Sequence, residues 1–339
     1  MLLSPAVLAL LVCSALACAV AAVAAGASLS VVAGWNPDDA SARQLSRERR
    51  AFLVETTVAV VLVWQLLSVA LFVATVEQLH PLFTGAMCAA GTLHASPFGY
   101  PTLSIKLAVF ALCGLWLVAH HAAPAAASTG LVRARHLALP VLAGALAAEN
   151  AVQLRYFADL DPAIITSCCA TVFDEAAGGV GAGLASLPVP ETRAVFFAGL
   201  AATLGAGWHA VRRRRSPVLF SVLSVLLGGI SVAAVVAWVA PGFYELPTHH
   251  CPFCLLSAEY FYVGFLLYLF LAVAVVAGAG SGLVHALRAL DPLGSIAPAE
   301  ERRLCFASMA GFALFALLAV WPMAVMTLRT FRFSRIGCS

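Results

Sequence analysis

Apolar residues recur along the chain in eight long runs, separated by short polar segments. Each run is long enough to cross the hydrocarbon core of a bilayer as a helix, which takes roughly 20 residues. In lipid, backbone groups must be hydrogen-bonded within the segment, and the strict alternation of a membrane barrel strand is absent. The pattern therefore predicts an all-α integral membrane protein with about eight transmembrane helices. The runs cover residues 3–33, 51–76, 103–121, 136–154, 192–211, 217–240, 252–284 and 304–328.

The composition agrees with a membrane protein. Hydrophobic residues make up 62% of the chain and charged residues only 10%, against about 25% charged residues in an ordinary soluble domain. The formal net charge of +3 says little about partners, because most basic residues lie where membrane topology explains them. No nucleic-acid partner is predicted.

Arginines gather in every second polar segment. Loops with an excess of basic residues face the cytoplasm, and the intervening segments hold only Arg155. This pattern predicts a bacterial inner (cytoplasmic) membrane protein with its N-terminus and C-terminus outside, although Arg329, Arg332 and Arg335 in the tail oppose the rule. The arginine-rich segments are 34–50, 122–135, 212–215 and 285–303.

The placement of the ten cysteines is the most informative chemical feature. Those within the apolar runs, or at their inner ends, are expected to be small buried hydrophobic residues: they are Cys13, Cys18, Cys113 and Cys305. The other six map to the outer side, where the compartment permits disulfides: they are Cys88, Cys168, Cys169, Cys251, Cys254 and Cys338. Their gathering on one side indicates a redox or metal-binding role.

The sharpest motif is His249-His250-Cys251-Pro252-Phe253-Cys254, at the start of the seventh apolar run. On a helix beginning here, cysteines three residues apart face the same side. The helix dipole would then favour the thiolate of Cys251, and two imidazoles stand beside it to exchange protons. The motif predicts a reactive dithiol. Half of a metal site and an inert pair stay open as alternatives.

Two further side chains lie near the cysteines if the helix continues from Pro252. A helical wheel places Tyr262 on the cysteine face and Glu259 within reach of it. A carboxylate just inside a membrane helix is by default a functional candidate. An interfacial role stays open for Glu259, and Tyr260, Tyr262 and Tyr268 are also compatible with an interfacial aromatic belt.

The block Cys251-Pro-Phe-Cys254-Leu-Leu-Ser-Ala258, opening a long apolar helix, resembles the fourth core helix of the vitamin K epoxide reductase family. The preceding order is also similar: a helix ending in Glu149-Asn150 and Gln153, an outer loop with Ser167-Cys168-Cys169-Ala170, a Pro-started helix and a hairpin through the arginines. The resemblance covers about residues 136–280 and extends to the other quinone-linked disulfide-forming membrane proteins.

The resemblance implies a four-helix core that exchanges electrons with a membrane quinone through the CxxC pair. Cys254 would be the cysteine on the quinone side and Cys251 its partner. Cys168 or Cys169 would carry electrons to and from extracytoplasmic thiols, with Cys88 as a further shuttle or disulfide partner. His249, His250, Glu259 and Tyr262 would serve proton transfer and the quinone pocket.

This chain departs from the family in its motif residues, and four extra helices flank the core. Its loop cysteines are adjacent, and adjacent cysteines bridge each other only with strain. Ala258 also stands where animal members place a tyrosine. The predicted organisation is then three N-terminal helices over residues 1–135, the redox core over 136–284, and a cytoplasmic loop, last helix and short tail over 285–339.

Two other functions remain open from the sequence. The first is a metal or cofactor site with His249, His250, Cys251 and Cys254 as ligands. The second is an anchor or electron-transfer subunit of a larger respiratory or export complex, in which the cysteines only form structural disulfides. Enzymatic activity is therefore left open.

Several polar residues fall inside or beside the predicted helices. Glu55 and Gln65 are expected to pair between helices. Lys106 is expected to extend to the outer interface. His120 and His136 are expected to lie at the inner interface.

Overall fold

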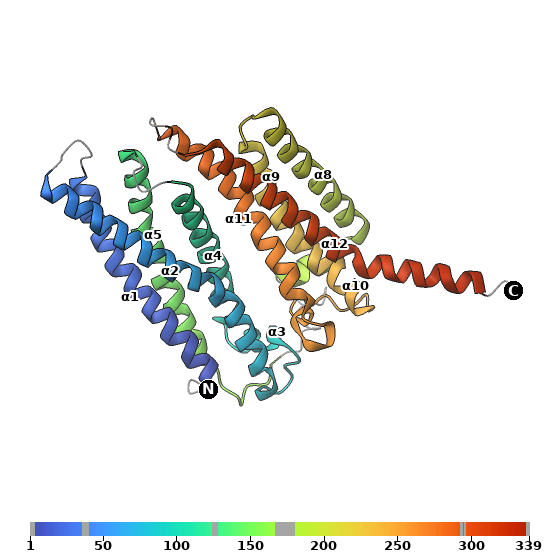
Figure 1. The fold of residues 1–339 in the computed structure, drawn as a ribbon. Helices are drawn as coiled ribbons and strands as arrows, with labels where there is room; N and C mark the ends of the chain where they lie inside the picture. The colour runs from blue at the N-terminus through green and yellow to red at the C-terminus, as the bar shows by residue number, and fades with distance from the viewer. Residues whose placement is uncertain are drawn as a thin grey trace. The chain divides into compact units, whose positions relative to one another are not determined.

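The computed structural model describes residues 4–35, 41–123, 128–166, 180–291, 294 and 296–336, with side chains of the last helix as far as Met323. Among these residues every regular element is a helix, and eight helices are long and apolar enough to cross a membrane. The predicted all-α, multi-pass membrane architecture is confirmed at this level (Figure 1). The spans are Pro5–Gly34, Ala42–Leu82, Gly99–Ala122, Thr129–Asp159, Val189–Arg213, Val218–Tyr244, Val263–Ala289 and Pro298–Met323.

The chain divides into two compact units. Unit 1 comprises residues 1–166 and 280–302, and unit 2 comprises residues 167–279 and 303–339. The described part of unit 1 is built mainly from α1 (Pro5–Gly34), α2 (Ala42–Leu79), α4 (Gly99–Ala122) and α5 (Thr129–Asp159). Two short elements, the 3₁₀ turn η1 (His80–Leu82) and α3 (Ala89–His94), lie between α2 and α4.

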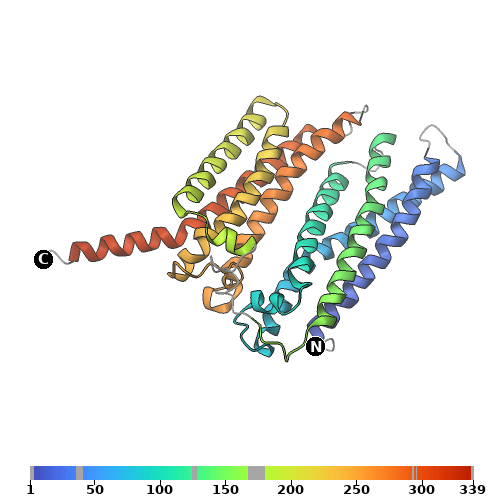
Figure 2. The same ribbon diagram turned by 180° about the vertical axis from the view of Figure 1, so that it is seen from behind.

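In unit 1, α5 packs against α1 and α4, and α2 also packs against α1 and α4. The four helices run side by side in both views (Figures 1 and 2). An apolar cluster that includes Val58, Leu62, Val109, Trp116 and Leu142 fills part of the space between them.

A fully buried ion pair lies among these apolar side chains. Lys106 Nζ lies 2.5 Å from Glu149 Oε1, and the two side chains are 0% and 1% exposed. Gln65 Nε2 donates to the other carboxylate oxygen of Glu149, and the ring of Phe72 lies 5.4 Å from the ammonium. The expected extension of Lys106 to the interface is wrong, because Glu149 offers its charge a partner inside the unit. The expected pairing of Gln65 between helices is confirmed.

Unit 2 contains α7 (Val180–Ala185), α8 (Val189–Arg213), α9 (Val218–Ala234), α10 (Ala240–Tyr244) and most of α11 (Val263–Ala289) and α12 (Pro298–Ile336). A π-helical turn, η2 (Val235–Val239), joins α9 to α10. The core of unit 2 is strongly aromatic: Trp238 and Phe315 both contact the ring of Phe196.

The helix predicted to start at Pro252 is shorter than expected. Two 3₁₀ turns, η3 (Cys254–Leu256) and η4 (Ala258–Tyr260), precede it, and α11 begins only at Val263. Hydropathy does not distinguish an apolar turn from the start of an apolar helix.

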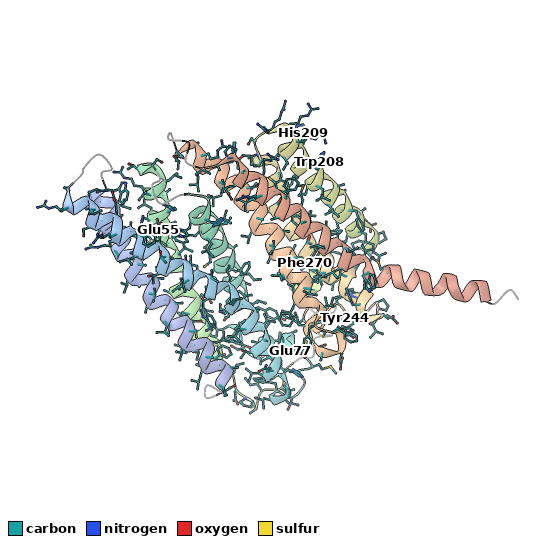
Figure 3. All side chains as sticks on the ribbon, in the orientation of Figure 1. Glu55, Glu77, Trp208, His209, Tyr244 and Phe270 are labelled. Atoms are coloured by element: carbon teal, nitrogen blue, oxygen red, sulfur yellow. The ribbon has the colours of Figure 1, made fainter. Side chains whose placement is uncertain are left out.

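In unit 2 the arginine turn and the cysteine motif lie at opposite ends. His209, beside the turn between α8 and α9, and Tyr244, beside the cysteine motif, mark the two ends in Figure 3, with Phe270 between them. The alternation of predicted inner and outer segments is therefore preserved within the unit. Which end faces the cytoplasm stays a prediction.

Candidate dithiol site

The cysteine motif follows a helix end that leaves one carbonyl without a helical donor. In the π turn the Ala240 N–H donates to Val235 O, five residues back. The next donor in that register would be residue 241, but Pro241 has no N–H, so Val236 O is left over. His250 Nδ1 lies 2.9 Å from Val236 O. Since a carbonyl only accepts, Nδ1 carries a proton and donates it, which anchors His250 to α9–α10.

Two tyrosine hydroxyls hold the backbone of the motif itself. The hydroxyl of Tyr244 donates to Cys251 O at 2.6 Å, and that of Tyr268 donates to Pro252 O at 2.7 Å. In a helix these carbonyls would accept from N–H groups four residues on. Ser257 Oγ likewise donates to Cys254 O at 2.9 Å. Side-chain hydroxyls therefore donate to three carbonyls of the motif, where a regular helix would use backbone N–H groups.

The segment ends in a strained backbone and a close contact. Phe261 and Tyr262 have φ values of 52° and 55°, a left-handed conformation that costs roughly 1–2 kcal/mol for each L-residue. At Gly264 a Cβ would lie 2.9 Å from the backbone carbon and oxygen of Leu255. Only glycine permits this contact at the start of α11, so the sequence Phe261 to Gly264 closes the segment on itself. We call residues 249–262 the dithiol loop.

The dithiol loop places its two cysteines differently. Cys251 is 0% exposed, whereas Cys254 is partly exposed and packs against the aromatic core. The Sγ atoms of the two residues lie within 4.8 Å of each other. His249 Nε2 lies 3.4 Å from the Sγ of Cys254.

The expected helix N-terminus at Cys251 is therefore wrong. Because α11 begins only at Val263, its N-terminus does not lie at Cys251 as the sequence predicted. The imidazole of His249 contacts Cys254, and that of His250 is anchored to Val236 O. The imidazole contact thus belongs to Cys254, the second cysteine of the motif and the more exposed of the two.

A hollow of about 720 Å³ lies beside the dithiol loop in unit 2. Glu259 and Tyr260 contribute polar groups to its wall, and most of the remaining wall is apolar or aromatic. The other lining residues are Gly242, Phe243, Glu245, Phe261, Val263, Leu317, Leu318, Trp321 and Pro322. The hollow is within the size range of small-molecule sites.

Tyr260 connects the hollow to the cysteines. Its ring lies 4.6 Å from that of Tyr244, whose hydroxyl binds Cys251 O. Burial raises the pKa of the Tyr260 hydroxyl, and negative charge on Cys254 and Glu259 raises it further. Tyr260 is thus a neutral donor at physiological pH.

The helical-wheel placement of Glu259 and Tyr262 is wrong, because both precede α11. Glu259 lies in the 3₁₀ turn η4 and lines the hollow. Tyr262 is 55% exposed and is not among the lining residues. Tyr260 stands in the place expected for Tyr262.

The remaining cysteines predicted for the site are distributed over both units. Cys88 lies in unit 1 at the N-terminus of α3 and is 1% exposed. The next residue, Ala89, donates its N–H to Glu77 Oε2 at 2.6 Å, and Glu77 is marked in Figure 3 near the end of α2. Cys168, Cys169 and Cys338 lie outside the described residues.

Sequence analysis missed Tyr244 and gave Tyr268 only an interfacial role. Both are tyrosines at the ends of apolar runs, where a membrane-interface position is the usual explanation. Nothing in the spacing of the motif indicates that their hydroxyls reach its carbonyls. Pro241, directly after the predicted helix 217–240, was the one available signal of an irregular turn.

Within unit 2 the site also has the ligand types of a metal centre. His249 and Cys254 lie side by side, and Cys251 is near. Imidazole nitrogen and thiolate sulfur are the usual ligands of zinc. The metal alternative therefore stays open for these three residues.

No protein-family model matches the chain, and no curated protein or solved structure is similar to it by the same comparisons. The resemblance to the vitamin K epoxide reductase family therefore rests on the residues of the motif and on the order of the elements.

Proposed function

We propose that the protein is a membrane thiol–disulfide oxidoreductase in which Cys251 and Cys254 exchange electrons between extracytoplasmic thiols and a membrane quinone. The observation that carries the proposal is the contact of 3.4 Å between His249 Nε2 and Cys254 Sγ within a CxxC loop. A thiolate is the nucleophile of disulfide exchange, and a neighbouring imidazole accepts the proton that the thiol must lose.

The dithiol loop supports a defined sequence of bond changes. In the oxidising direction a substrate thiolate attacks the Cys251–Cys254 disulfide, and a second substrate thiol resolves the mixed disulfide. The substrate leaves as a disulfide, and the cysteines of the loop remain as two thiols. Reoxidation forms the bond between Cys251 and Cys254 and releases two electrons and two protons. His249 holds the proton from Cys254.

A quinone, when bound, supplies the chemistry that accepts two electrons and two protons. The hollow beside the loop fits an apolar ring with polar edges. Its aromatic and aliphatic wall suits the ring, and the Tyr260 hydroxyl is a donor for a carbonyl oxygen. Glu259 adds a carboxylate for proton exchange.

Two finer points of the resemblance belong to this proposal. The four-helix redox core over residues 136–284 would consist of α5, α8, α9 and α11. Of these, α5 packs with α1 and α4 in unit 1, whereas α8, α9 and most of α11 belong to unit 2. Cys88, Cys168 and Cys169 are the proposed carriers to outer thiols.

The test is turnover in lipid nanodiscs with dithiothreitol as thiol donor and a short-chain ubiquinone as acceptor. Quinol formation is followed by absorbance. The proposal expects turnover by the wild type and none by Cys254→Ser or Cys251→Ser. Cys13→Ser, in α1 of unit 1, is the matched control and retains turnover.

Absence of turnover in the wild type, or its survival in Cys254→Ser, contradicts the proposal. Zinc in a 1:1 ratio to purified protein, lost in His249→Ala and Cys254→Ser alike, would favour the metal alternative instead.

A further inference from the structure

Unit 1 contains a second group of ionisable side chains, which shares no residue with the dithiol loop. It centres on Glu55 of α2, labelled in Figure 3. Arg135 NH2 lies 3.3 Å from Glu55 Oε1, and His136 Nε2 lies 3.4 Å from the same oxygen. His120 Nδ1 lies 3.6 Å from the other oxygen, Oε2. The expected pairing of Glu55 between helices is confirmed.

The group is largely enclosed. The side chains of His136, Arg135 and Glu55 are 0%, 3% and 10% exposed. The expected interfacial depth of His136 stays a prediction. His120 is 30% exposed and stacks on Trp116, with ring centroids 5.2 Å apart. His120 is thus the most exposed side chain of the group.

The positive charge of Arg135 balances the negative charge of Glu55 while both histidines are neutral. Arg135 is always protonated and offsets Glu55. Among the described residues no hydrogen-bond partner is present for His120 Nδ1, His136 Nε2 or Arg135 Nε. Of these atoms, His136 Nε2 and His120 Nδ1 face the carboxylate of Glu55 at 3.4 and 3.6 Å. Both distances are longer than a charge-assisted hydrogen bond, which is typically 2.7–2.9 Å.

We propose that Glu55, His120 and His136 form a proton-binding site that takes up one proton through His120. A proton on an imidazole nitrogen that faces Glu55 turns a loose contact into a charge-assisted hydrogen bond. Histidine is the side chain whose charge changes between pH 5 and 8. The geometry gives the carboxylate one such imidazole on each oxygen.

The site joins all four long helices of unit 1. Glu55 belongs to α2, His120 to α4, and Arg135 and His136 to α5, while His136 Nδ1 lies 3.0 Å from Ser28 Oγ of α1. No charged residue occurs in α1 itself. In the segment 280–302 of the same unit, His285 and Arg288 face Glu301 and not Glu55. Proton uptake therefore tightens one end of the helix bundle.

The experiment measures proton uptake by the full-length protein in nanodiscs between pH 8 and pH 5.5, with a pH-indicator dye. Glu55→Gln and His120→Gln are each expected to bind about one proton fewer per molecule than the wild type over the range in which histidine titrates. Glu301→Gln is the matched control, because it also removes a carboxylate that faces a histidine and an arginine, His285 and Arg288. It should change the uptake by much less.

Circular dichroism and elution volume report whether each variant is folded. His120→Gln alters only the partly exposed member, so it serves if Glu55→Gln fails to fold. Uptake by folded His120→Gln equal to that of the wild type overturns the proposal. The proposal is also overturned if Glu301→Gln loses as many protons of uptake as Glu55→Gln. Neither outcome depends on quinone turnover, so this proposal and the proposed function fail separately.

Discussion

The imidazole of His249 lies 3.4 Å from the sulfur of Cys254 and thereby distinguishes the two cysteines of the motif. Cys251 is completely buried, and the Tyr244 hydroxyl holds its carbonyl. Cys254 combines partial exposure with a proton acceptor. We therefore infer that Cys254 is the attacking thiol and that Cys251 is the resolving one.

Removing a tyrosine hydroxyl should loosen the dithiol loop without removing either thiol. Tyr244→Phe leaves Cys251 O without its donor, and an unsatisfied buried acceptor costs about 1–3 kcal/mol. Amide hydrogen exchange over residues 249–262 should accelerate, and Tyr268→Phe should act in the same direction through Pro252 O.

Tyr262→Phe is the control for these two variants, because Tyr262 is 55% exposed. It removes a hydroxyl from the same segment while leaving both held carbonyls in place. Equal exchange rates in Tyr244→Phe and Tyr262→Phe would show that the hydroxyl of Tyr244 does not hold the loop.

Gly264→Ala should displace the dithiol loop from α11. The added Cβ would lie 2.9 Å from the backbone of Leu255, and such overpacking typically costs about 1–3 kcal/mol. Thermal unfolding should shift down, and the alkylation rate of Cys254 should change. Gly144→Ala is the control, since a Cβ there meets nothing within 4 Å. Equal unfolding temperatures for Gly264→Ala and Gly144→Ala would show that the close contact at Gly264 does not limit stability.

The sequence predicted the parts of this fold that follow from hydropathy. Eight apolar runs were sufficient because a bilayer demands helices of a minimum length. The start of α11 at Val263 was not predictable in this way, since it depends on hydroxyls from Tyr244 and Tyr268. Sequence spacing likewise identified the CxxC pair but not the contact between His249 and the sulfur of Cys254.

The position of Lys106 was missed for a related reason. A lone lysine in an apolar run usually reaches for the interface, and only the packing of α4 against α5 reveals Glu149 as its partner. Buried charges depend on contacts between helices that a single sequence does not display.

Lys106→Met should destabilise unit 1 strongly. It leaves the carboxylate of Glu149 buried without its counter-charge, and breaking a buried pair in this way costs about 3–5 kcal/mol. The double variant Lys106→Met/Glu149→Gln should recover part of that loss, because no unpaired charge remains. The measurement is the midpoint of unfolding in a denaturing detergent titration.

Arg288→Met is the control for the buried pair. It breaks the more exposed ion pair with Glu301, where a contribution of about 0–1 kcal/mol is usual. A double variant that is less stable than Lys106→Met would contradict the role assigned to the pair.

Membrane orientation is tested by labelling cysteines introduced at exposed positions in a cysteine-free background. Leu246→Cys, beside the dithiol loop, should react with an impermeant maleimide added outside intact cells. Arg214→Cys, in the turn between α8 and α9, should react only after permeabilisation. The reverse pattern would place the dithiol loop in the cytoplasm and remove its oxidising compartment.

The most direct test of the account is the alkylation rate of each cysteine of the reduced motif at pH 7, in variants that retain only Cys251 or only Cys254. Cys254 is predicted to react faster than Cys251 and faster than a model thiol with a pKa near 8.5. A hydrogen bond to a charged group contributes about 1.5–3 kcal/mol, so His249→Ala should slow Cys254 by roughly tenfold or more. His250→Ala, which removes the imidazole that contacts Val236 O, should slow it less. Equal and slow rates for the two cysteines, unaffected by His249→Ala, would contradict the assignment of this loop as a reactive dithiol.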